Sequence, residues 1–304
     1  MTKRLLDLGY GLARMSLQAI GIVVLVFFMC RIVPGDAVDR LALEGNLTAA
    51  QETRLRAEMG LDRSLPVQFA DWAGSALQGD FGVSLRYHRP VSEMLANALP
   101  STLRLAFLSF LVGLAIAVGI AVAAVMTGSR WLAGLVNLVN VWAIALPTFC
   151  VGVIAILVFS IWLGWLPVLG GLLMPVMIIG IDNAGQIGKP LFEELREAAT
   201  SAHVRTARAK GLRPWRIALF HLLPTALPVA LAMSGLVLAG LVAGTLTMEI
   251  LFGLPGLGSL MLNAIHGRDY PVVQAAITVA AVGLVVVNAL IDLVHHTIDP
   301  RLSR

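Results

Sequence analysis

The sequence predicts an all-α polytopic membrane protein with six transmembrane helices. A polar extracytoplasmic insert is expected after the first of them, and a short cytoplasmic helix between the fourth and the fifth. Hydrophobic residues make up 58% of the 304 and charged residues 13%, about half the charged fraction of a soluble domain. Residues 132–181 carry no charged side chain, although one span needs only roughly 20 apolar residues. Cys30 and Cys150 both lie in apolar segments, so neither a disulfide framework nor a cysteine metal motif is expected.

The apolar stretches place six spans in order, separated by turn formers or charged segments. They are predicted at residues 15–30, 105–126, 134–161, 172–188, 222–248 and 272–291. Residues 164–171 combine Trp, Gly and Pro, which favours an interfacial break between the third and fourth spans. Residues 249–271 are predicted as an outer loop. We therefore divide the chain into a segment 1–33 with the first span, an insert 34–100 and a core 101–304.

Charge asymmetry predicts the orientation of these spans. The insert 34–100 has six arginines and nine acidic residues, a net charge of −3. Residues 189–221 have seven Lys or Arg and three acids, a net charge of +4. Because basic loops stay inside, both termini are predicted to be cytoplasmic. The basic residues gather in such loops, so the net charge of +4 does not indicate nucleic-acid binding.

The basic stretch 203–224 is the most distinctive segment of the second half. Its first part is predicted to form a short helix that stops at Gly211 in a left-handed conformation. Pro214 then suits the first turn of a new helix that leads into the fifth span. In the insert, Thr48 and Gln51 have the spacing of a capping box at the start of a helix over 48–59.

An ordered set of motifs extends over essentially the whole length of the chain. It comprises PGDA at 34–37, GLDRSLPVQF at 60–69, GDFGVSL at 79–85, RPVSEML at 89–95, LPSTLRLA at 99–106, LGWLP at 163–167, VRTARAKGL at 204–212, EILFGLPGLGSL at 249–260, RDYPVVQA at 268–275 and DPR at 299–301. With these motifs the chain resembles the inner-membrane permease subunits of bacterial ABC importers. Within that group it is similar to the B-type subunit of the dipeptide, oligopeptide and nickel branch.

The resemblance implies that 203–224 docks into a cleft of a partner ATPase as a coupling helix. Residues 205–207 occupy the slot of the family's EAA pattern, Gly211 that of its glycine, and residues 223–224 that of its Leu-Pro pair. His221 stands where an aliphatic residue is more usual. We expected apolar side chains of the helix to contact the ATPase and its cations to pair with acids there. The coupling residues implied are Val204, Arg205, Thr206, Ala207, Arg208, Lys210, Gly211 and Leu212.

The resemblance also implies the partners: a second homologous permease, two ATPase subunits and an extracytoplasmic substrate-binding protein, in the bacterial cytoplasmic membrane. The chain has no GxxxxGK[ST] loop, so ATP and Mg are expected on the ATPases and no cofactor, metal or catalytic residue in this chain. Alternating access, inward-facing at rest, is expected. Di- or oligopeptides and nickel or metal-chelate complexes remain alternative substrates.

Ionisable residues within a span are functional candidates because burying a charge there is costly. Asp182, Asn183 and Gln186 form a polar strip in the fourth span, and Glu249 ends the fifth. We predict that these four residues line the translocation path. The alternatives are a shifted fourth span that leaves Asp182 at a wet cytoplasmic end, and a tight loop at 254–258 that leaves Glu249 in solvent.

Two other functional classes were weighed. A secondary transporter driven by an ion gradient would show inverted repeats and broken spans with paired charges, and would leave the basic loop unexplained. An intramembrane enzyme would need a catalytic constellation such as HExxH or GxSxG, which this sequence lacks. The sequence therefore favours the permease.

Overall fold

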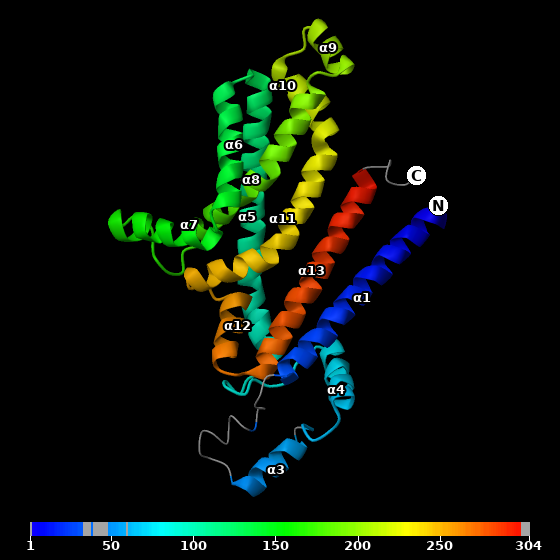
Figure 1. The fold of residues 1–304 in the computed structure, drawn as a ribbon, viewed down its shortest axis with the longest axis vertical. Helices are drawn as coiled ribbons and strands as arrows, with labels where there is room; N and C mark the ends of the chain where they lie inside the picture. The colour runs from blue at the N-terminus through cyan, green and yellow to red at the C-terminus, as the bar shows by residue number, and fades with distance from the viewer. Residues whose placement is uncertain (1, 33–37, 39–47, 59, 299–304) are drawn as a thin grey trace. The chain divides into compact units, whose positions relative to one another are not determined.

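The structure is a computed structural model that describes residues 2–32, 38, 48–58 and 60–298 (Figure 1). The motifs at 34–37 and 299–301 lie outside the described residues. The chain forms two compact units. The first contains Met1–Ser101 and Pro255–Val285, and the second contains Thr102–Leu254 and Val286–Arg304. The sequence did not predict that residues 255–285 belong to the same unit as residues 1–101.

The described residues are predominantly helical. The elements are α1 (Thr2–Ile32), α3 (Ala49–Glu58), α4 (Leu65–Leu77), α5 (Val91–Thr127), α6 (Arg130–Ala145), α7 (Thr148–Ala155), η1 (Ile156–Trp162), α8 (Leu173–Ala198), α9 (Ala202–Ala209), α10 (Pro214–Ile217), η2 (Ala218–Leu222), α11 (Leu223–Leu251), α12 (Leu257–His266) and α13 (Tyr270–Ile298). The elements η1 and η2 are short π-helices that continue α7 and α10. The described part of the chain contains an isolated bridge between Val83 and Pro90 but no strand.

The predicted all-α membrane class is confirmed. By length and composition, three helices among the described residues can cross a membrane, at Val91–Thr127, Pro214–Leu241 and Tyr270–Ile291. A fourth crossing results if the bent pair of α6 and α7 with η1 counts as one span. Residues Ser16–Ile32 of α1 form a shorter apolar helix. Helix α8 fills the position of the predicted fourth span and extends beyond it to Ala198.

The third span predicted at 134–161 is broken in the structure. The helix ends at Ala145 and starts again at Thr148, with a bend of 102° between the two parts. Pro147 disfavours the helical conformation of the residue before it, and Leu146 is extended at φ −116° and ψ 119°. A hydropathy pattern cannot detect this break, because both halves are equally apolar.

The expected outer loop at 249–271 is also corrected, since it contains α12. Helix α11 ends with Gly253 in the left-handed region at φ +61°. Leu254 N donates to Glu249 O and Gly253 N to Ile250 O, the two bonds of a Schellman cap. The glycine-rich motif is therefore a helix stop followed by a new helix start.

In the first unit, aromatic side chains join α1 to α4. Phe27 is fully buried and makes edge-on contacts with Phe28 and Phe69, at centroid distances of 5.5 and 5.3 Å. Trp72 completes the cluster at 5.8 Å from Phe27. The capping box before α3 is confirmed, because Thr48 N donates to Gln51 Oε1 at 2.8 Å and Gln51 N donates to Thr48 Oγ1 at 3.4 Å.

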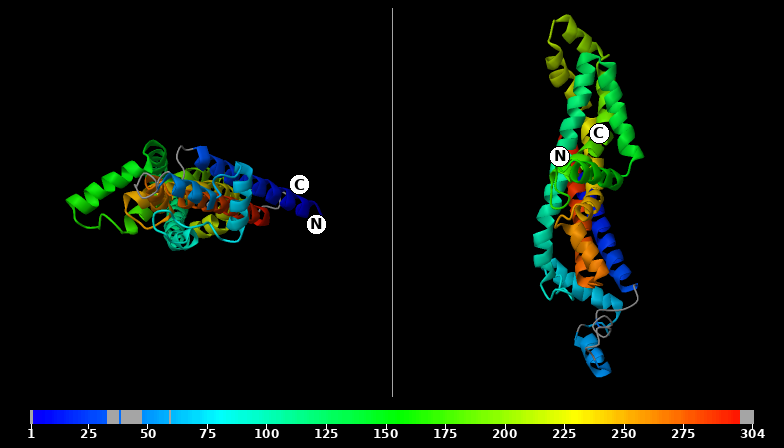
Figure 2. Two further views of the ribbon diagram at one scale, coloured as in Figure 1. Left: turned by 90° about the horizontal axis from the view of Figure 1, so that it is seen from below. Right: turned by 90° about the vertical axis from the view of Figure 1, so that its left-hand side faces the viewer.

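In the second unit, α8 is the central helix and packs against α6, α7 and α11. Glycines allow close approach to its neighbours. A Cβ on Gly185 would lie 2.5 Å from Val139 O of α6, and a Cβ on Gly180 would lie 2.7 Å from Val112 Cγ1 of α5. Asn140 Nδ2 of α6 also donates to Gly185 O at 3.0 Å. Helices α6 and α8 lie side by side in Figures 1 and 2.

We predict that Gly185→Ala lowers the thermal stability of the detergent-solubilised protein. The added methyl group meets backbone of α6, and overpacking of this kind typically costs about 1–3 kcal/mol. The control is Gly119→Ala in α5, where a Cβ would meet no atom within 4 Å. There the change should stabilise by about 0.5–1 kcal/mol, because alanine loses less backbone entropy in a helix. Tryptophan fluorescence during heating measures Tm for both variants, and equal shifts would contradict the close contact.

Candidate functional site

Helix α9 is the short helix that the basic stretch was predicted to form. It begins after Ser201, whose backbone is extended, and it ends at Lys210. Gly211 has φ +74°, as predicted. Gly211 N donates to Arg208 O at 2.9 Å and Leu212 N donates to Ala207 O at 3.3 Å, which is again a Schellman cap. The glycine is needed for its conformation, since a Cβ there would meet no atom within 4 Å.

One face of α9 is buried in the second unit. Val204 is 0% exposed and Ala207 is 4% exposed. Both belong to an apolar cluster to which α5, α6, α8, α10, η2 and α11 also contribute. Leu212 packs against the same cluster. Hydrophobic contact therefore attaches α9 to the ends of the helices that it connects (Figures 1 and 2).

The opposite face of α9 is exposed and basic. Arg205, Thr206, Arg208 and Lys210 are all exposed, and Thr206 Oγ1 donates to Ala202 O at 3.1 Å. Among the described residues, α9 itself contains no acidic side chain. The helix therefore offers a partner a cationic face that is held in place from behind.

The eight predicted coupling residues thus divide into two groups. The side chains of Val204 and Ala207, predicted to contact another protein, are buried inside the chain in this structure. They hold α9, while the polar residues face outward. Sequence reasoning missed the residues that receive them, such as Leu191, Leu195 and Ala198 of α8. Their spacing of four and three residues on one helix face would have been the signal.

Residues after α9 lead directly into the membrane part. Pro214 is at the start of α10, as predicted, and Arg216 lies over the Trp215 ring at 5.3 Å from its centroid. Helix α10, η2 and α11 follow without a break, and Pro214–Leu241 meets the criterion for one span. Only the short turn 210–213 therefore separates α9 from a helix that can span the membrane.

The polar strip of α8 is split between two faces. Gln186 Nε2 donates to Asp182 Oδ2 at 2.9 Å, with Gln186 exposed and Asp182 partly exposed. Asn183 is 3% exposed, and its Cβ lies against Gly113 of α5. Glu249 of α11 is fully buried. The structure therefore does not bring the four predicted path residues together, and only Asp182 and Gln186 share an accessible face.

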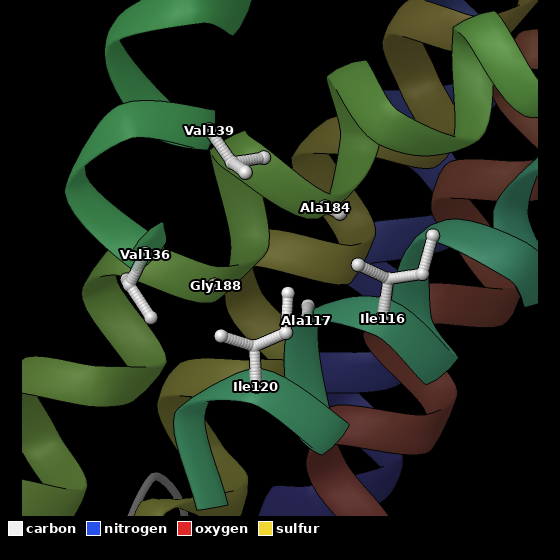
Figure 3. A pocket seen from close by; sticks show the side chains of 7 residues that line it. All are labelled: Ile116, Ala117, Ile120, Val136, Val139, Ala184 and Gly188. Atoms are coloured by element: carbon white, nitrogen blue, oxygen red, sulfur yellow. The ribbon is translucent and has the colours of Figure 1, made fainter. Parts of the chain in front are cut away.

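A small pocket between α5, α6 and α8 is lined by apolar residues (Figure 3). Its lining residues are Ile116, Ala117, Ile120, Val136, Val139, Ala184 and Gly188. It contains no group that could bind a charged ligand. Within the described part of the chain, no group of three or more His, Cys, Asp or Glu is placed to hold a metal ion.

Polar contacts join α8 to α6 beyond the pocket. Lys189 Nζ donates to Asn137 Oδ1 at 2.6 Å and to Glu193 Oε1 at 2.5 Å. The hydrogen bond from Lys189 lowers the pKa of the Glu193 carboxyl below its ordinary value. This end of α8, next to α9, is therefore held by both charge and packing.

We predict that Val204→Ala loosens α9 locally. The change removes two buried methyl groups, worth about 1.5 kcal/mol at about 0.8 kcal/mol each, so the opened state should rise roughly tenfold. Hydrogen–deuterium exchange of peptides covering 202–210 measures this opening. The control is Thr206→Ala, which removes a hydroxyl and a methyl group from an exposed side chain and should leave the exchange unchanged. Equal exchange in both variants would show that burial of Val204 does not hold the helix.

Comparison with known proteins agrees with this arrangement. Residues 94–304 match the family described as the binding-protein-dependent transport system inner membrane component. A protein of Brucella abortus strain 2308 whose assigned name is peptide transport system permease is 30% identical over 296 residues, covering 92% of this chain and 93% of its own length. The glutathione transport system permease protein GsiC of Salmonella typhimurium is 32% identical over 287 residues, covering 92% of this chain and 93% of its own.

A solved structure shares the fold. It is the MetNI methionine ABC transporter in inward facing conformations, with a TM-score of 0.56 and 20% identity, covering 68% of this chain and 96% of the matched chain. Together with the family match over most of the chain, this confirms the resemblance derived from the motifs. The chain belongs to the binding-protein-dependent transport system inner membrane components, as an ABC importer permease of the peptide branch.

Proposed function

We propose that this chain forms half of the translocation path of an ATP-driven importer for peptides, with α9 as its coupling helix. The observation that carries the proposal is α9 itself: an exposed cationic face on a helix whose other face is buried. The names of the relatives, peptide permease and glutathione permease, support a peptide-like substrate. Nickel or metal-chelate complexes are the second substrate class.

Coupling requires that force on α9 reaches the membrane helices. A helix seated in an ATPase cleft moves as a rigid body when the cleft closes. Val204 and Ala207 tie α9 to α8 and α10, and α10 continues into α11. Arg205, Arg208 and Lys210 would then pair with acidic groups of the ATPase, which supplies ATP and Mg binding.

The remaining partners follow from the same proposal. A second homologous permease completes the path, two ATPase subunits bind at the cytoplasmic side, and a substrate-binding protein delivers the substrate outside. The basic charge of the loop that contains α9 supports a cytoplasmic position for both termini under the positive-inside rule. Alternating access, inward-facing at rest, remains part of this proposal.

We propose that Asp182 and Gln186 line the path. They share an accessible face of a helix that is otherwise mainly buried, and the carboxylate suits the ammonium group of a peptide. Asn183 and Glu249 are buried, so we assign them a role in packing rather than in direct substrate contact in this conformation.

The coupling proposal is tested with Arg208→Glu in the complete importer reconstituted in proteoliposomes. Stimulation of ATP hydrolysis by the loaded binding protein should fall about tenfold, because like charges at an interface cost several kcal/mol. Arg130→Glu is the matched control, an exposed residue in the other predicted cytoplasmic turn. The binding protein is loaded in parallel with a dipeptide, glutathione or a nickel chelate, and the ligand that stimulates identifies the substrate class. If ATP hydrolysis by the Arg208→Glu variant were still fully stimulated, the basic loop would serve only to set the topology of the spans.

The path proposal is tested with Asp182→Asn, which keeps the shape and removes the charge. Uptake of a radiolabelled dipeptide into proteoliposomes should fall about tenfold. This corresponds to the loss of about 1.4 kcal/mol of interaction between the carboxylate and the ammonium group of the peptide. Glu197→Gln neutralises an exposed carboxylate at the far end of α8 and should leave uptake unchanged. Normal uptake by Asp182→Asn at equal expression would exclude the path role.

A further inference from the structure

A buried carboxylate joins two turns of the first unit that are far apart in sequence. Asp269 is 1% exposed, and its carboxylate accepts from Ser84 Oγ at 2.5 Å, from Leu85 N at 3.1 Å and from Arg86 N at 3.3 Å. The Ser84 hydroxyl is also buried and accepts from Tyr87 N at 2.9 Å. We name this set of contacts the Asp269 clasp.

The first turn is folded tightly around Ser84. Ser84 N donates to Arg89 O at 2.9 Å, His88 N donates to Ser84 O at 3.0 Å, and Val91 N donates to Gly82 O at 3.0 Å. The fold of the turn leaves His88 with φ +51°. Backbone hydrogen bonds within the turn therefore hold it in addition to the three hydrogen bonds to the Asp269 carboxylate.

The second turn lies between α12 and α13. Asp269 N donates to Ala264 O at 2.8 Å, and Val273 N donates to Asp269 O at 3.0 Å, so Asp269 precedes the first turn of α13. A negative charge is favourable at a helix N-terminus. Arg268 has φ +49°, and with His88 it completes the set of non-glycine residues with positive φ in the described part of the chain. Such strain persists only where surrounding contacts impose it.

Two residues of the first turn, Arg86 and Tyr87, form an exposed cation–π pair. Arg86 Cζ lies 5.3 Å from the centroid of the Tyr87 ring, and Tyr87 is 46% exposed. Arg86 Cδ and Nη1 lie 3.2 Å from the place of a Cβ on Gly267, so the two turns touch there as well. Arg268 is exposed beside them. Rigid arginine and tyrosine side chains are the types enriched at the energetic centres of protein interfaces.

The exposed formal charges of the two turns are cationic, at Arg86 and Arg268, and His88 and His266 are exposed nearby. Arg89 is paired with Glu93 at 2.5 Å. Asp80, before the first turn, keeps its negative charge although its carboxylate accepts from Gly82 N at 2.9 Å, and the Asp269 carboxylate is buried. The surface therefore suits an acidic partner, although the insert as a whole has an acidic excess.

We propose that the Arg86–Tyr87 turn, held by the Asp269 clasp, is a docking point for an acidic face of the substrate-binding protein. The inference rests on the proposed function, which places both turns on the extracytoplasmic side. Asp269 is a positioning residue, because it fixes the turn and is itself buried. Preorganisation of this kind raises affinity by reducing the ordering cost of binding.

The first test combines Arg86→Glu with Arg268→Glu in the complete importer. The affinity for the binding protein of the same transport system is measured by biolayer interferometry at low and at physiological ionic strength. The dissociation constant should rise about tenfold at low ionic strength, with a smaller effect of salt than in the wild type. Basal ATP hydrolysis should be unchanged. Arg63→Glu, a charge reversal in the same insert at a residue paired with Asp71, should bind within about twofold of the wild type.

The second test addresses positioning by Asp269→Asn, with Ser84→Ala as a milder variant in case the first fails to fold. The binding-protein concentration that gives half-maximal ATPase stimulation should rise several-fold, while maximal stimulation stays the same. A general loss of structure would lower the maximum instead, which would overturn the positioning role.

Unchanged affinity in the double arginine variant would overturn the docking proposal. A contact with lipid is the alternative. Short-chain phosphatidylglycerol would then stabilise the wild type but not the double variant, while the affinity for the binding protein stayed the same. That result would also overturn the docking proposal. A wild-type importer that neither binds nor responds to the binding protein would instead refute the proposed function.

Discussion

The attachment of α9 depends on the burial of Val204 and Ala207 in an apolar cluster. A helix of eight residues is not stable alone in water, so its position must come from packing. The cluster includes side chains from every neighbouring helix at that end of the second unit. The Schellman cap at Gly211 then turns the chain toward α10 without a long flexible loop. The exposed cations are therefore displayed on a part of the protein that moves with the helices behind it.

The same principle of close packing governs α8. Gly180 and Gly185 let α5 and α6 approach its backbone, and two apolar clusters meet along its length. A densely packed interior transmits displacement rather than absorbing it. The proposed transmission from α9 needs such stiffness, because a soft α8 would bend where the force enters. Lys189, bound to both Asn137 and Glu193, adds a polar tie near that entry point.

The sequence predicted what local chemistry determines. Gly211, Pro214 and the Thr48 capping box were all placed correctly, because each acts through its immediate neighbours. Hydropathy located the three helices that can cross a membrane, but it missed the bend at Pro147 and the start of α12, since both lie within continuously apolar sequence. The inward direction of Val204 was missed because the resemblance assigned the apolar residues of this helix to contact with the ATPase. The clasp between Ser84 and Asp269 could not be predicted, because neither motif contains a pattern that indicates contact with the other.

The arrangement of polar groups on α8 supports the proposal that a second permease completes the path. Asp182 and Gln186 lie on an accessible face within an otherwise apolar region, and a carboxylate in contact with lipid would be costly. Water or another chain must therefore cover that face. The pocket inside the unit cannot serve instead, because it is lined by apolar residues and offers nothing to a zwitterion. In the proposed importer the peptide path would run along the outside of α8, and a second permease facing this one would close it.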